Sequence, residues 1–264
     1  MEMITVNGVT FCAFSHIRQT GLVRHGFSTK RGGVSRGVFA SMNLSHTRGD
    51  EADCVRENIR RMTEALGMDS AQTAFCEQVH GTRIVCANAL HRNGGDAYPD
   101  DLLATDGLIA DTSGVALATM HADCVPLFFL DPVRRAIGMV HAGWRGTAAD
   151  IAGITVRRMA EAFGSNAADL LVGIGPSIGP CCFEVDEDVV QAFDVVYVAK
   201  SLTDARKSYI DLWRANEEML VGAGVRRENI ETAGICTKCR ADLFYSHRRD
   251  GKARGAMAAF MQLI

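Results

Sequence analysis

The sequence has no long apolar run, no run of basic residues and no low-complexity segment, and each absence excludes a class of protein. Its apolar runs are much shorter than the roughly 20 residues that a transmembrane helix requires. Lysine and arginine are scattered and the formal net charge is only −3, which argues against a nucleic-acid-binding surface. The N-terminus has no signal-peptide pattern. We therefore expect a cytoplasmic protein that binds neither membranes nor nucleic acids.

A disulfide framework is also absent. The nine cysteines are odd in number, scattered and mostly found in apolar stretches, as is typical of reduced thiols in a cytoplasmic enzyme. No stretch has the composition of a linker, so nothing in the 264 residues marks a domain boundary. A chain of this length can bury a large core, either as one domain or as two closely joined ones.

The stretch 114–146 combines apolar runs with reactive side chains. Two short runs, 114–120 and 136–140, are each followed by residues that could bind a metal or attack a carbonyl group. Short apolar runs bounded by turn residues are typical of buried strands, which places Cys124 and His141 at strand ends. Because a rigid sheet can hold reactive groups at the rim of a pocket, we predict that the functional site lies here.

Elsewhere the sequence pattern predicts scaffold elements. A hairpin is expected around Asn7-Gly8, and helical spacing of apolar residues predicts a helix from Asp50 to Leu66, capped by Asp50 and stopped by Gly67. The loop 175–185 is long for a simple connection, which favours a role in shaping a pocket. Further helices are expected at 149–163 and 211–220, and further strands at 22–29, 75–80, 170–174, 230–235 and 254–260.

Three residues from different parts of the chain form a candidate metal site. His80, Cys124 and His141 would supply two imidazoles and one thiolate, each near glycine or proline at an expected strand end. Catalytic zinc sites usually have three protein ligands and one position open to water or substrate. Spacing alone leaves two other interpretations open, namely buried structural residues, or a cysteine nucleophile with its base.

The other cysteines fit known metal motifs poorly. Cys236 and Cys239 form a CxxC pair, but a zinc finger needs a second CxxC or a histidine pair. The adjacent Cys181 and Cys182 have the wrong spacing for that role, so a zinc finger is only weakly indicated. A zinc deaminase of the HxE and PCxxC type is excluded, because no histidine has a glutamate two residues later and Ile235 precedes Cys236.

Several polar residues have both a functional and an ordinary interpretation. Asp123, next to the central cysteine, could orient a ligand or move a proton, or could cap a turn. The basic, glycine-rich loop 30–35 could bind an anion through its backbone N–H groups or could be a flexible turn. His247, followed by Arg248, could bind an anionic group or belong to a solvated basic turn.

A series of motifs along the chain resembles those of one known family. The motifs are His25-Gly26-Phe27-Ser28-Thr29, Gly32-Gly33-Val34-Ser35, Asn43-Leu44, Gln78-Val79-His80-Gly81, Ala122-Asp123-Cys124-Val125-Pro126, His141-Ala142-Gly143-Trp144-Arg145-Gly146, Gly173-Ile174-Gly175-Pro176-Ser177-Ile178 and Phe244-Tyr245-Ser246-His247-Arg248. The motifs are similar to those of the YfiH family, also called the laccase-domain, polyphenol oxidase or peptidoglycan-editing-factor family, which includes the mammalian purine enzyme FAMIN. The resemblance covers nearly the whole chain in the same order. Two positions depart from the pattern, because His121 stands where threonine is usual and Cys239 is not part of it.

The resemblance implies an α+β fold of the YfiH-like type, with residues 1–264 forming a single domain of mixed β-sheets flanked by helices. It also implies zinc bound by His80, Cys124 and His141. The implied activities are phosphorolysis of adenosine, inosine and S-methyl-5′-thioadenosine, with adenosine deamination at the same site. Some bacterial members are instead assigned to peptidoglycan editing, the removal of UDP-MurNAc precursors that contain L-serine. An older name describes the family as copper oxidases.

Our first hypothesis is a zinc-dependent purine nucleoside enzyme in which zinc activates a water or polarises a leaving group. Asp123 is the candidate catalytic residue. The alternative is a metal-free cysteine hydrolase in which Cys124 attacks an amide and His141 acts as the base. We expect a purine nucleoside and phosphate as partners, and a monomer or a weak homo-oligomer. The substrate-binding candidates, chosen on motif and charge, are Arg31, Arg145 and Arg248 for phosphate, Asn43 for the nucleoside, and His247.

The histidine pattern argues against a multicopper oxidase, whatever the family label. Such enzymes bind a copper cluster through many imidazoles, mostly from His-x-His pairs. None of the eight histidines here lies two residues from another. Two histidines and a cysteine could still hold one metal, and copper could displace zinc there in vitro. We also expect His121 to point away from Cys124, because side chains alternate along an extended strand.

Overall fold

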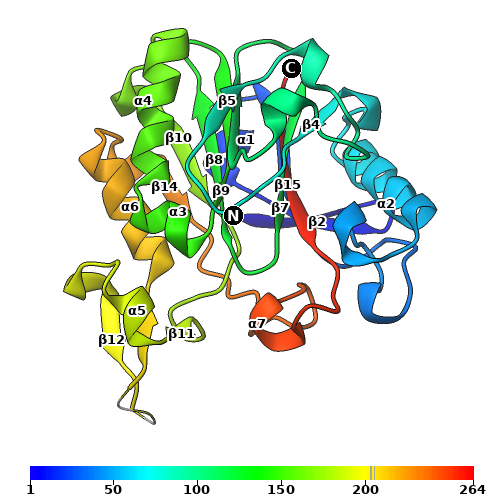
Figure 1. The fold of residues 1–264 in the computed structure, drawn as a ribbon. Helices are drawn as coiled ribbons and strands as arrows, with labels where there is room; N and C mark the ends of the chain where they lie inside the picture. Colours follow the sequence, from blue (N-terminus) through cyan, green and yellow to red (C-terminus); the bar gives the residue numbers. More distant parts are fainter. Residues whose placement is uncertain (203, 205) are drawn as a thin grey trace.

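The structure, a computed structural model that describes residues 1–202, 204 and 206–264, is built on two six-stranded sheets (Figure 1). Both are mixed: β4 pairs parallel with β7, β10 with β14 and β5 with β6, whereas the other neighbours are antiparallel. The strand order in the first sheet is β1 (Glu2–Val6), β2 (Val9–Ala13), β3 (Val23–Ser28), β15 (Met257–Leu263), β7 (Ala116–His121) and β4 (Thr73–Phe75). The strand order in the second is β14 (Ile230–Thr232), β10 (Leu171–Ile174), β8 (Val125–Asp131), β9 (Ala136–Ala142), β6 (Gly107–Ala110) and β5 (Ile84–Cys86).

Helices cover the outer faces of the two sheets (Figure 1). On the first sheet, α2 (Ala52–Ala65) packs Val55, Ile59 and Met62 into a core cluster with residues of β2, β7 and β15. On the second sheet, α4 (Ile151–Phe163) and α6 (Leu212–Gly222) form another cluster with β8, β9 and β10. The layers are therefore α2, first sheet, second sheet, and α4 with α6. This arrangement confirms the α+β class with mixed sheets flanked by helices.

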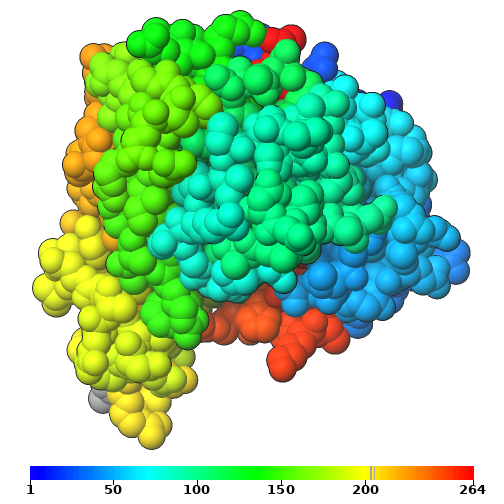
Figure 2. All heavy atoms as spheres, turned by 45° about the horizontal axis from the view of Figure 1, so that its top comes forward, coloured from blue at the N-terminus to red at the C-terminus, as the bar shows by residue number. Residues whose placement is uncertain are grey.

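A third, small sheet carries part of the site. It consists of β11 (Glu184–Val185), β13 (Ser208–Ile210) and β12 (Val198–Lys200), in that order. With α5 (Glu187–Val190) it forms the yellow lobe that projects from the body in Figure 2. The other short helices are α1 (Ser15–Arg18), α3 (Trp144–Ala148) and α7 (His247–Asp250), with 3₁₀ turns at Gly37–Phe39, His46–Arg48, Ser70–Gln72, Ala89–His91, Asp100–Leu102, Ala167–Asp169, Val195–Tyr197 and Arg227–Asn229.

The alternation of side chains along β8 places them in two different cores. Phe128 and Leu130 belong to the core between the sheets, whereas Leu127 and Phe129 belong to the core beneath α4 and α6. Successive side chains of a strand point to opposite faces, so a strand buried on both faces is apolar throughout. Full burial of a leucine or phenylalanine side chain contributes about 1.5–3 kcal/mol. The apolar runs of the central stretch thus act as the rigid frame of the site.

Most predicted elements are present, with two corrections. The hairpin at Asn7-Gly8 and the stop of α2 at Gly67, where φ is 73°, are confirmed. Asp50 does not cap α2, because the carboxylate of Asp50 accepts hydrogen bonds from Ser35 and Asn43 instead and Glu51 holds the cap position. His80 does not end a strand, since β4 stops at Phe75 and His80 lies in the following loop.

The chain changes sheets at the centre of the molecule. Strand β7 belongs to the first sheet and β8 to the second, and the three residues between them, 122–124, form the corner. Asp123 adopts a φ of 85°, a left-handed conformation that turns the backbone sharply. Cys124 therefore lies where the two sheets part.

Within the described residues, no helix has both the length and the apolar character needed to cross a bilayer.

Candidate metal centre and its cavities

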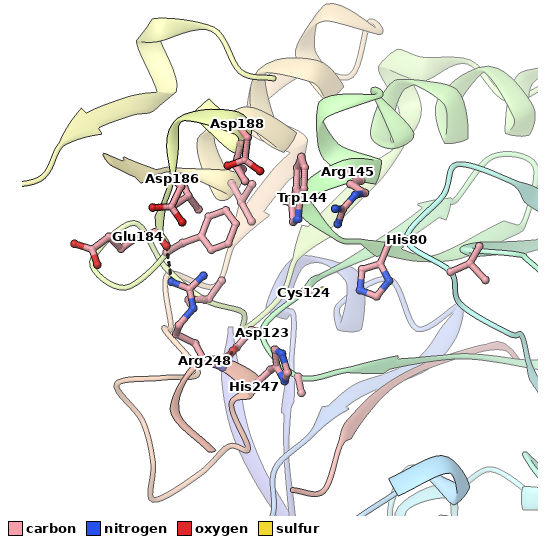
Figure 3. Close-up of a pocket in the computed structure, with 17 residues that line it drawn as sticks. His80, Asp123, Cys124, Trp144, Arg145, Glu184, Asp186, Asp188, His247 and Arg248 are labelled. Atoms are coloured by element: carbon pink, nitrogen blue, oxygen red, sulfur yellow. Dashed lines mark hydrogen bonds between the residues drawn. The ribbon is translucent and has the colours of Figure 1, made fainter. Parts of the chain in front are cut away.

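Three side chains that are distant in sequence come together beside this corner. One potential ligand atom from each of His80, Cys124 and His141 lies within 4.8 Å of the others. Cys124 comes from the corner, His141 from the end of β9, and His80 from the loop after β4, so both sheets contribute. The imidazole rings of His80 and His141 are 4.8 Å apart and nearly perpendicular. Figure 3 shows His80 and Cys124 on the wall of a cavity.

The carboxylate of Asp106 organises this group. Asp106 is fully buried immediately before β6, and it accepts hydrogen bonds from the backbone N–H groups of Val79 (3.2 Å), His80 (2.9 Å) and Gly81 (2.6 Å). A further contact of 2.9 Å joins it to Nδ1 of His141. A carboxylate on one ring nitrogen of a histidine sets its tautomer and leaves the other nitrogen free for a metal. Asp106 therefore positions two of the three candidate ligands.

The pKa values of the group reflect its mutual contacts. Burial raises the pKa of the Cys124 thiol, but the adjacent His141 and His80 outweigh this effect and lower it to about 6. Burial lowers the pKa of His141, but the Cys124 thiolate and Asp106 outweigh it and raise the value to about 9. Burial opposes ionisation of Asp106 too, yet the bonds from His141 and the backbone amides lower the pKa of that carboxyl. The chain therefore favours a thiolate at Cys124, the form that binds metals and attacks electrophiles.

The backbone of Gly143 lies close to the ring of His80 and helps to hold it in place. A side chain at Gly143 would meet the ring of His80, because a Cβ there would lie 2.6 Å from its Cδ2 atom and 3.5 Å from Sγ of Cys124. His80 itself adopts a positive φ of 65°. Gln78 anchors the loop on β7 through two bonds to the backbone of Met120, of 2.8 and 2.6 Å. The glycine and the strained loop are both needed to bring His80 to Cys124.

The prediction that His121 points away from Cys124 was wrong. Nδ1 of His121 lies 3.2 Å from the carbonyl oxygen of Cys124, and the His121 ring is 5.4 Å from the ring of His141. The alternation rule fails because the chain is not extended there, since the corner turns at Asp123. Nε2 of His121 is 2.8 Å from the hydroxyl of Thr119. His121 supports the corner and is not one of the three residues whose ligand atoms converge.

The candidate ligands separate two cavities. The first has a volume of about 540 Å³ and lies between the body and the small sheet (Figure 3). Aromatic side chains of Trp144 and Phe183 and the carboxylates of Glu184, Asp186 and Asp188 line it. This cavity combines flat apolar surfaces with hydrogen-bond acceptors, which suits an aromatic ligand that carries hydroxyl groups.

The second cavity, of about 390 Å³, shares His80 and Cys124 with the first but contains Arg48 and Arg254. Arg254 is only 4% exposed, and its Nε atom has no hydrogen-bond partner in the described part of the chain. Its one side-chain bond there goes to the carbonyl oxygen of Gly255 at 3.0 Å. Burial and the charge of Arg48 lower the pKa of Arg254 to about 10. Because a buried charge is costly unless paired, this cavity suits an anion.

Three of the five predicted substrate residues line these cavities. Arg145 lies against the ring of Trp144 at 4.1 Å in the first cavity, Arg248 lies opposite it, and His247 borders both cavities (Figure 3). Nη1 of Arg248 donates a bond of 2.5 Å to the carbonyl of Glu184. Their side chains are exposed, so they are free to meet a ligand.

The other two predicted substrate residues lie outside both cavities. Arg31 bonds to the backbone oxygen and the carboxylate of Asp242 at 3.2 and 3.4 Å. Asn43 is fully buried, and its amide is engaged by Ser45, Asp50 and the backbone of Ala256. Motif similarity alone does not distinguish a residue that supports the fold from one that contacts the ligand. Asn43 supports the C-terminal strand β15, because its side chain accepts a hydrogen bond from the backbone N–H of Ala256.

Asp123 lines the first cavity, but its carboxylate is already engaged. Its two oxygens accept bonds from the hydroxyl of Thr237 (2.7 Å), the hydroxyl of Ser246 (2.9 Å) and the backbone N–H of Arg248 (2.7 Å). Of the two interpretations left open by the sequence, this geometry favours the fixing of turns. Asp123 ties the corner beside Cys124 to the chain segments at Thr237 and Ser246.

From sequence, Asp106 could orient a ligand, move a proton or cap a turn, and it was not among the predicted site residues; Arg48 and Arg254 were not predicted at all. An aspartate directly before a glycine, as in Thr105-Asp106-Gly107, resembles an ordinary turn. Arg254 follows a basic, glycine-containing turn, and its burial could not be expected from residue type. Only the packing of β15 between β3 and β7 brings that segment to the cavity.

The fold and the site together define a class, that of α+β proteins in which two histidines and a cysteine meet between two cavities. A family model described as multi-copper polyphenol oxidoreductase laccase matches residues 24–264, and the chain belongs to this family. The resemblance inferred from the motifs is thereby confirmed.

Curated relatives and solved structures agree with this assignment. Purine nucleoside phosphorylase YlmD of Geobacillus stearothermophilus is 40% identical over 242 residues, which cover 89% of this chain and 88% of that protein. Purine nucleoside phosphorylase LACC1 of Homo sapiens is 34% identical over 247 residues, 90% of this chain and 55% of that protein. The crystal structure of YlmD from Geobacillus stearothermophilus matches with a TM-score of 0.89 at 35% identity, covering 98% of this chain and 97% of that one. The hypothetical protein YfiH of Bacillus licheniformis matches with a TM-score of 0.90 at 33% identity, covering 99% of each chain.

Asp106→Asn tests the organising role of the carboxylate. The amide keeps the shape but loses the charge and one acceptor, so we expect metal affinity or activity to fall roughly 10–100-fold. Competition with a chromogenic chelator measures the metal affinity, and nucleoside turnover measures the activity. Asp111→Asn, at an exposed aspartate just after the same strand, is the matched control and should change neither. Unchanged affinity and activity in the Asp106 variant, with normal circular dichroism, would contradict the role.

His121→Thr tests whether the site has a fourth protein ligand. Because His121 bonds to Thr119 and to the Cys124 carbonyl, we expect the variant to keep most of its metal and its activity. Loss of these two hydrogen bonds should lower the free energy of unfolding by about 1–3 kcal/mol. Metal content, turnover and a melting curve measure these effects. A variant that folds but has lost the metal would show that His121 completes a closed, structural site.

Proposed function

We propose that the protein is a zinc-dependent purine nucleoside phosphorylase whose zinc is held by His80, Cys124 and His141. The observation that carries this proposal is the position of these residues between a cavity lined by aromatic rings and carboxylates and a cavity with an unpaired buried arginine. Such a pair of cavities suits one aromatic and one anionic substrate. Several relatives that are 34–40% identical are named purine nucleoside phosphorylases, which supports the same reaction.

The donor set of the site fits zinc. One thiolate and two imidazoles are preferred zinc ligands, and three protein ligands leave one position open, as in catalytic sites. The atoms lie within 4.8 Å of one another, and tetrahedral bonds of about 2.0–2.3 Å would need only a small contraction. The bond from Asp106 to His141 is the outer contact expected of a zinc-binding histidine. Zinc, when bound, supplies a Lewis acid that stabilises negative charge developing on the substrate.

The first cavity offers contacts for a nucleoside. Trp144 and Phe183 provide flat apolar surfaces for a purine ring. The carboxylates of Glu184, Asp186 and Asp188 can accept hydrogen bonds from ribose hydroxyls. Arg145 and His247 lie at the same cavity and can donate hydrogen bonds to ring nitrogens or to the 6-oxo group of inosine.

The second cavity offers contacts for inorganic phosphate. The guanidinium of Arg254 is buried without an ion pair in the described residues, and Arg48 adds a second positive charge. A planar guanidinium matches two phosphate oxygens, and a low-dielectric environment strengthens each charge-assisted bond. Phosphate would neutralise the charge that the fold leaves unpaired.

The reaction then needs the two substrates to meet beside Cys124. An oxygen of monohydrogen phosphate forms a bond to C1′ of the ribose as the bond from C1′ to N9 of the purine breaks. The phosphate proton passes to the departing purine, and the products are ribose 1-phosphate and the base. The bond electrons go to the purine, where cationic and hydrogen-bonding groups stabilise the departing base. The chain contributes orientation of both substrates and their removal from bulk water. Following the family resemblance, we include adenosine, inosine and S-methyl-5′-thioadenosine as substrates and adenosine deamination as a second reaction.

A cysteine hydrolase that edits cell-wall precursors is the second candidate. The observation in its favour is the position of Cys124 beside His141, because His141, with His80, outweighs burial and lowers the pKa of the thiol to about 6. A thiolate next to an imidazole is the arrangement of cysteine nucleophiles. His80 is not needed in that mechanism, whereas it completes a zinc site. The convergence of three ligands rather than two therefore favours the metal.

A multicopper oxidase, as the family description suggests, has little support. In the described residues, two groups of three or more side chains could hold a metal, namely the His/Cys/His group and a group of four cysteines. Neither provides the many imidazoles of an oxygen-reducing copper cluster. A phenol assay nevertheless belongs in the experiment below, because copper could occupy the site in vitro.

Cys124→Ser tests the proposed function. Serine removes the thiolate, so we expect phosphorolysis of adenosine and inosine to fall at least about 100-fold, with zinc lost from this site and with normal far-UV circular dichroism. Purine release with phosphate present, ammonia release and phenol oxidation in air are measured on the zinc-loaded, copper-free wild type and variant, and again after loading with copper. Cys86→Ser, at an exposed cysteine, is the control. Phenol oxidation that needs stoichiometric copper, with no nucleoside turnover in any metal form, would overturn the proposal. Hydrolysis of an L-serine-containing precursor without metal would favour the second candidate.

Arg254→Gln tests the phosphate site. Loss of a charge-assisted bond of about 1.5–3 kcal/mol should raise the KM for phosphate roughly 10–100-fold and leave the KM for the nucleoside nearly unchanged. Arg48→Gln, at an exposed residue that should not disturb folding, should shift the same parameter in the same direction. Arg158→Gln, on the surface of α4, is the control. A nucleoside KM that rises as much as the phosphate KM would assign the cavity to another ligand.

A further inference from the structure

A second group of potential metal ligands lies outside the site described above. We propose that Cys181, Cys182, Cys236 and Cys239 bind a structural zinc ion through four thiolates. One sulfur from each residue lies within 4.8 Å of the others. The inference is independent of the proposed activity, because none of the four residues belongs to the His/Cys/His group.

The distances between sulfurs match a metal site better than disulfides. The Sγ atom of Cys239 is 3.7 Å from that of Cys181 and 3.5 Å from that of Cys182. In a tetrahedral zinc site with bonds of about 2.3 Å, neighbouring sulfurs lie about 3.8 Å apart. A disulfide requires about 2.05 Å, and it joins sulfurs in pairs, whereas here Cys239 contacts two partners equally. Four cysteine sulfurs that converge within 4.8 Å of one another are typical of a zinc site.

The fold brings the two cysteine pairs together. Strands β10 and β14 are parallel neighbours at the edge of the second sheet, and the segments that follow them stay paired through a bridge between Ser177 and Cys236. The backbone N–H of Thr237 donates to the carbonyl of Ser177 at 3.0 Å. The chain after β10 then turns to present Cys181 and Cys182. The sequence objection of wrong spacing therefore fails, because an adjacent pair and a CxxC pair can meet from two parallel strands.

The polar surroundings suit a thiolate cluster. The backbone N–H of Gly179 donates to Sγ of Cys236 at 3.3 Å. This N–H group would stabilise a thiolate at Cys236. A divalent cation held by the four cysteines would remove the protons of the coordinating thiols.

The position of the cluster gives the zinc a role in shaping the first cavity. Phe183 and Glu184 line that cavity and follow Cys182 directly. On the other side, Thr237 lies between Cys236 and Cys239 in sequence, and its hydroxyl holds the carboxylate of Asp123. A metal bound by both pairs would therefore clamp two walls of the cavity together.

Zinc analysis in a Cys124→Ser background tests the proposal, because that variant weakens the other site. We expect about one zinc per chain by mass spectrometry, with X-ray absorption showing about four sulfur neighbours at about 2.3 Å. Adding Cys181→Ser and Cys239→Ser, at the two exposed members, should remove this zinc. Adding Cys86→Ser, an exposed cysteine outside the group, should leave it in place.

Cobalt substitution of the otherwise unmodified chain provides a second measurement that does not require the variants to fold. A four-thiolate site should give intense visible absorption of tetrahedral cobalt and stronger sulfur-to-metal charge transfer than the single thiolate of the His/Cys/His group can give. Three results would overturn the proposal: four freely reactive thiols in chain purified without chelators, a disulfide between members of the group in protein kept under reducing conditions, or iron in place of zinc.

Discussion

The site depends on the buried carboxylate of Asp106. A buried carboxylate is tolerated only when its oxygens accept hydrogen bonds. The oxygens of Asp106 accept them from three consecutive backbone N–H groups of the His80 loop and contact the ring of His141. The His80 loop follows a strand of the first sheet, whereas Asp106 and His141 belong to the second. One carboxylate thus joins the two halves of the sandwich at the point where a metal could bind. Any displacement of Asp106 would leave several buried polar groups unpaired at once.

A second carboxylate performs a similar task on the other side of Cys124. Asp123 binds Thr237, Ser246 and the backbone of Arg248, and so connects the corner between the sheets to two C-terminal segments. The segment at Ser246 continues into His247 and Arg248, which border the first cavity, and Thr237 lies between Cys236 and Cys239 of the proposed four-thiolate zinc site. The cavity walls are therefore held by hydrogen bonds between loops, whereas the strands beneath are held by apolar packing. This division allows a rigid ligand group beside adaptable walls.

The family description and the chemistry of the site differ in an instructive way. A laccase-type description implies several coppers, but the donor set offers two imidazoles and one thiolate beside two cavities of different character. Sequence similarity identifies the fold and the positions of the ligands, whereas the reaction depends on what the cavities can hold. An unpaired buried arginine on one side and aromatic rings with carboxylates on the other favour two substrates over dioxygen.

The sequence by itself determined the elements and the reactive residues. The apolar run of β8, the helical spacing of α2 and the stop at Gly67 follow from local patterns, and the motifs around His80, Cys124 and His141 indicated the ligand group. Tertiary structure alone decided the rest. Whether Asn43 supports the fold or contacts a ligand, where His121 points, and whether two unrelated cysteine pairs meet all depend on contacts between segments far apart in the chain. Local sequence cannot encode such contacts individually, because they arise from the pairing of whole strands and from the corner at which the chain leaves one sheet for the other.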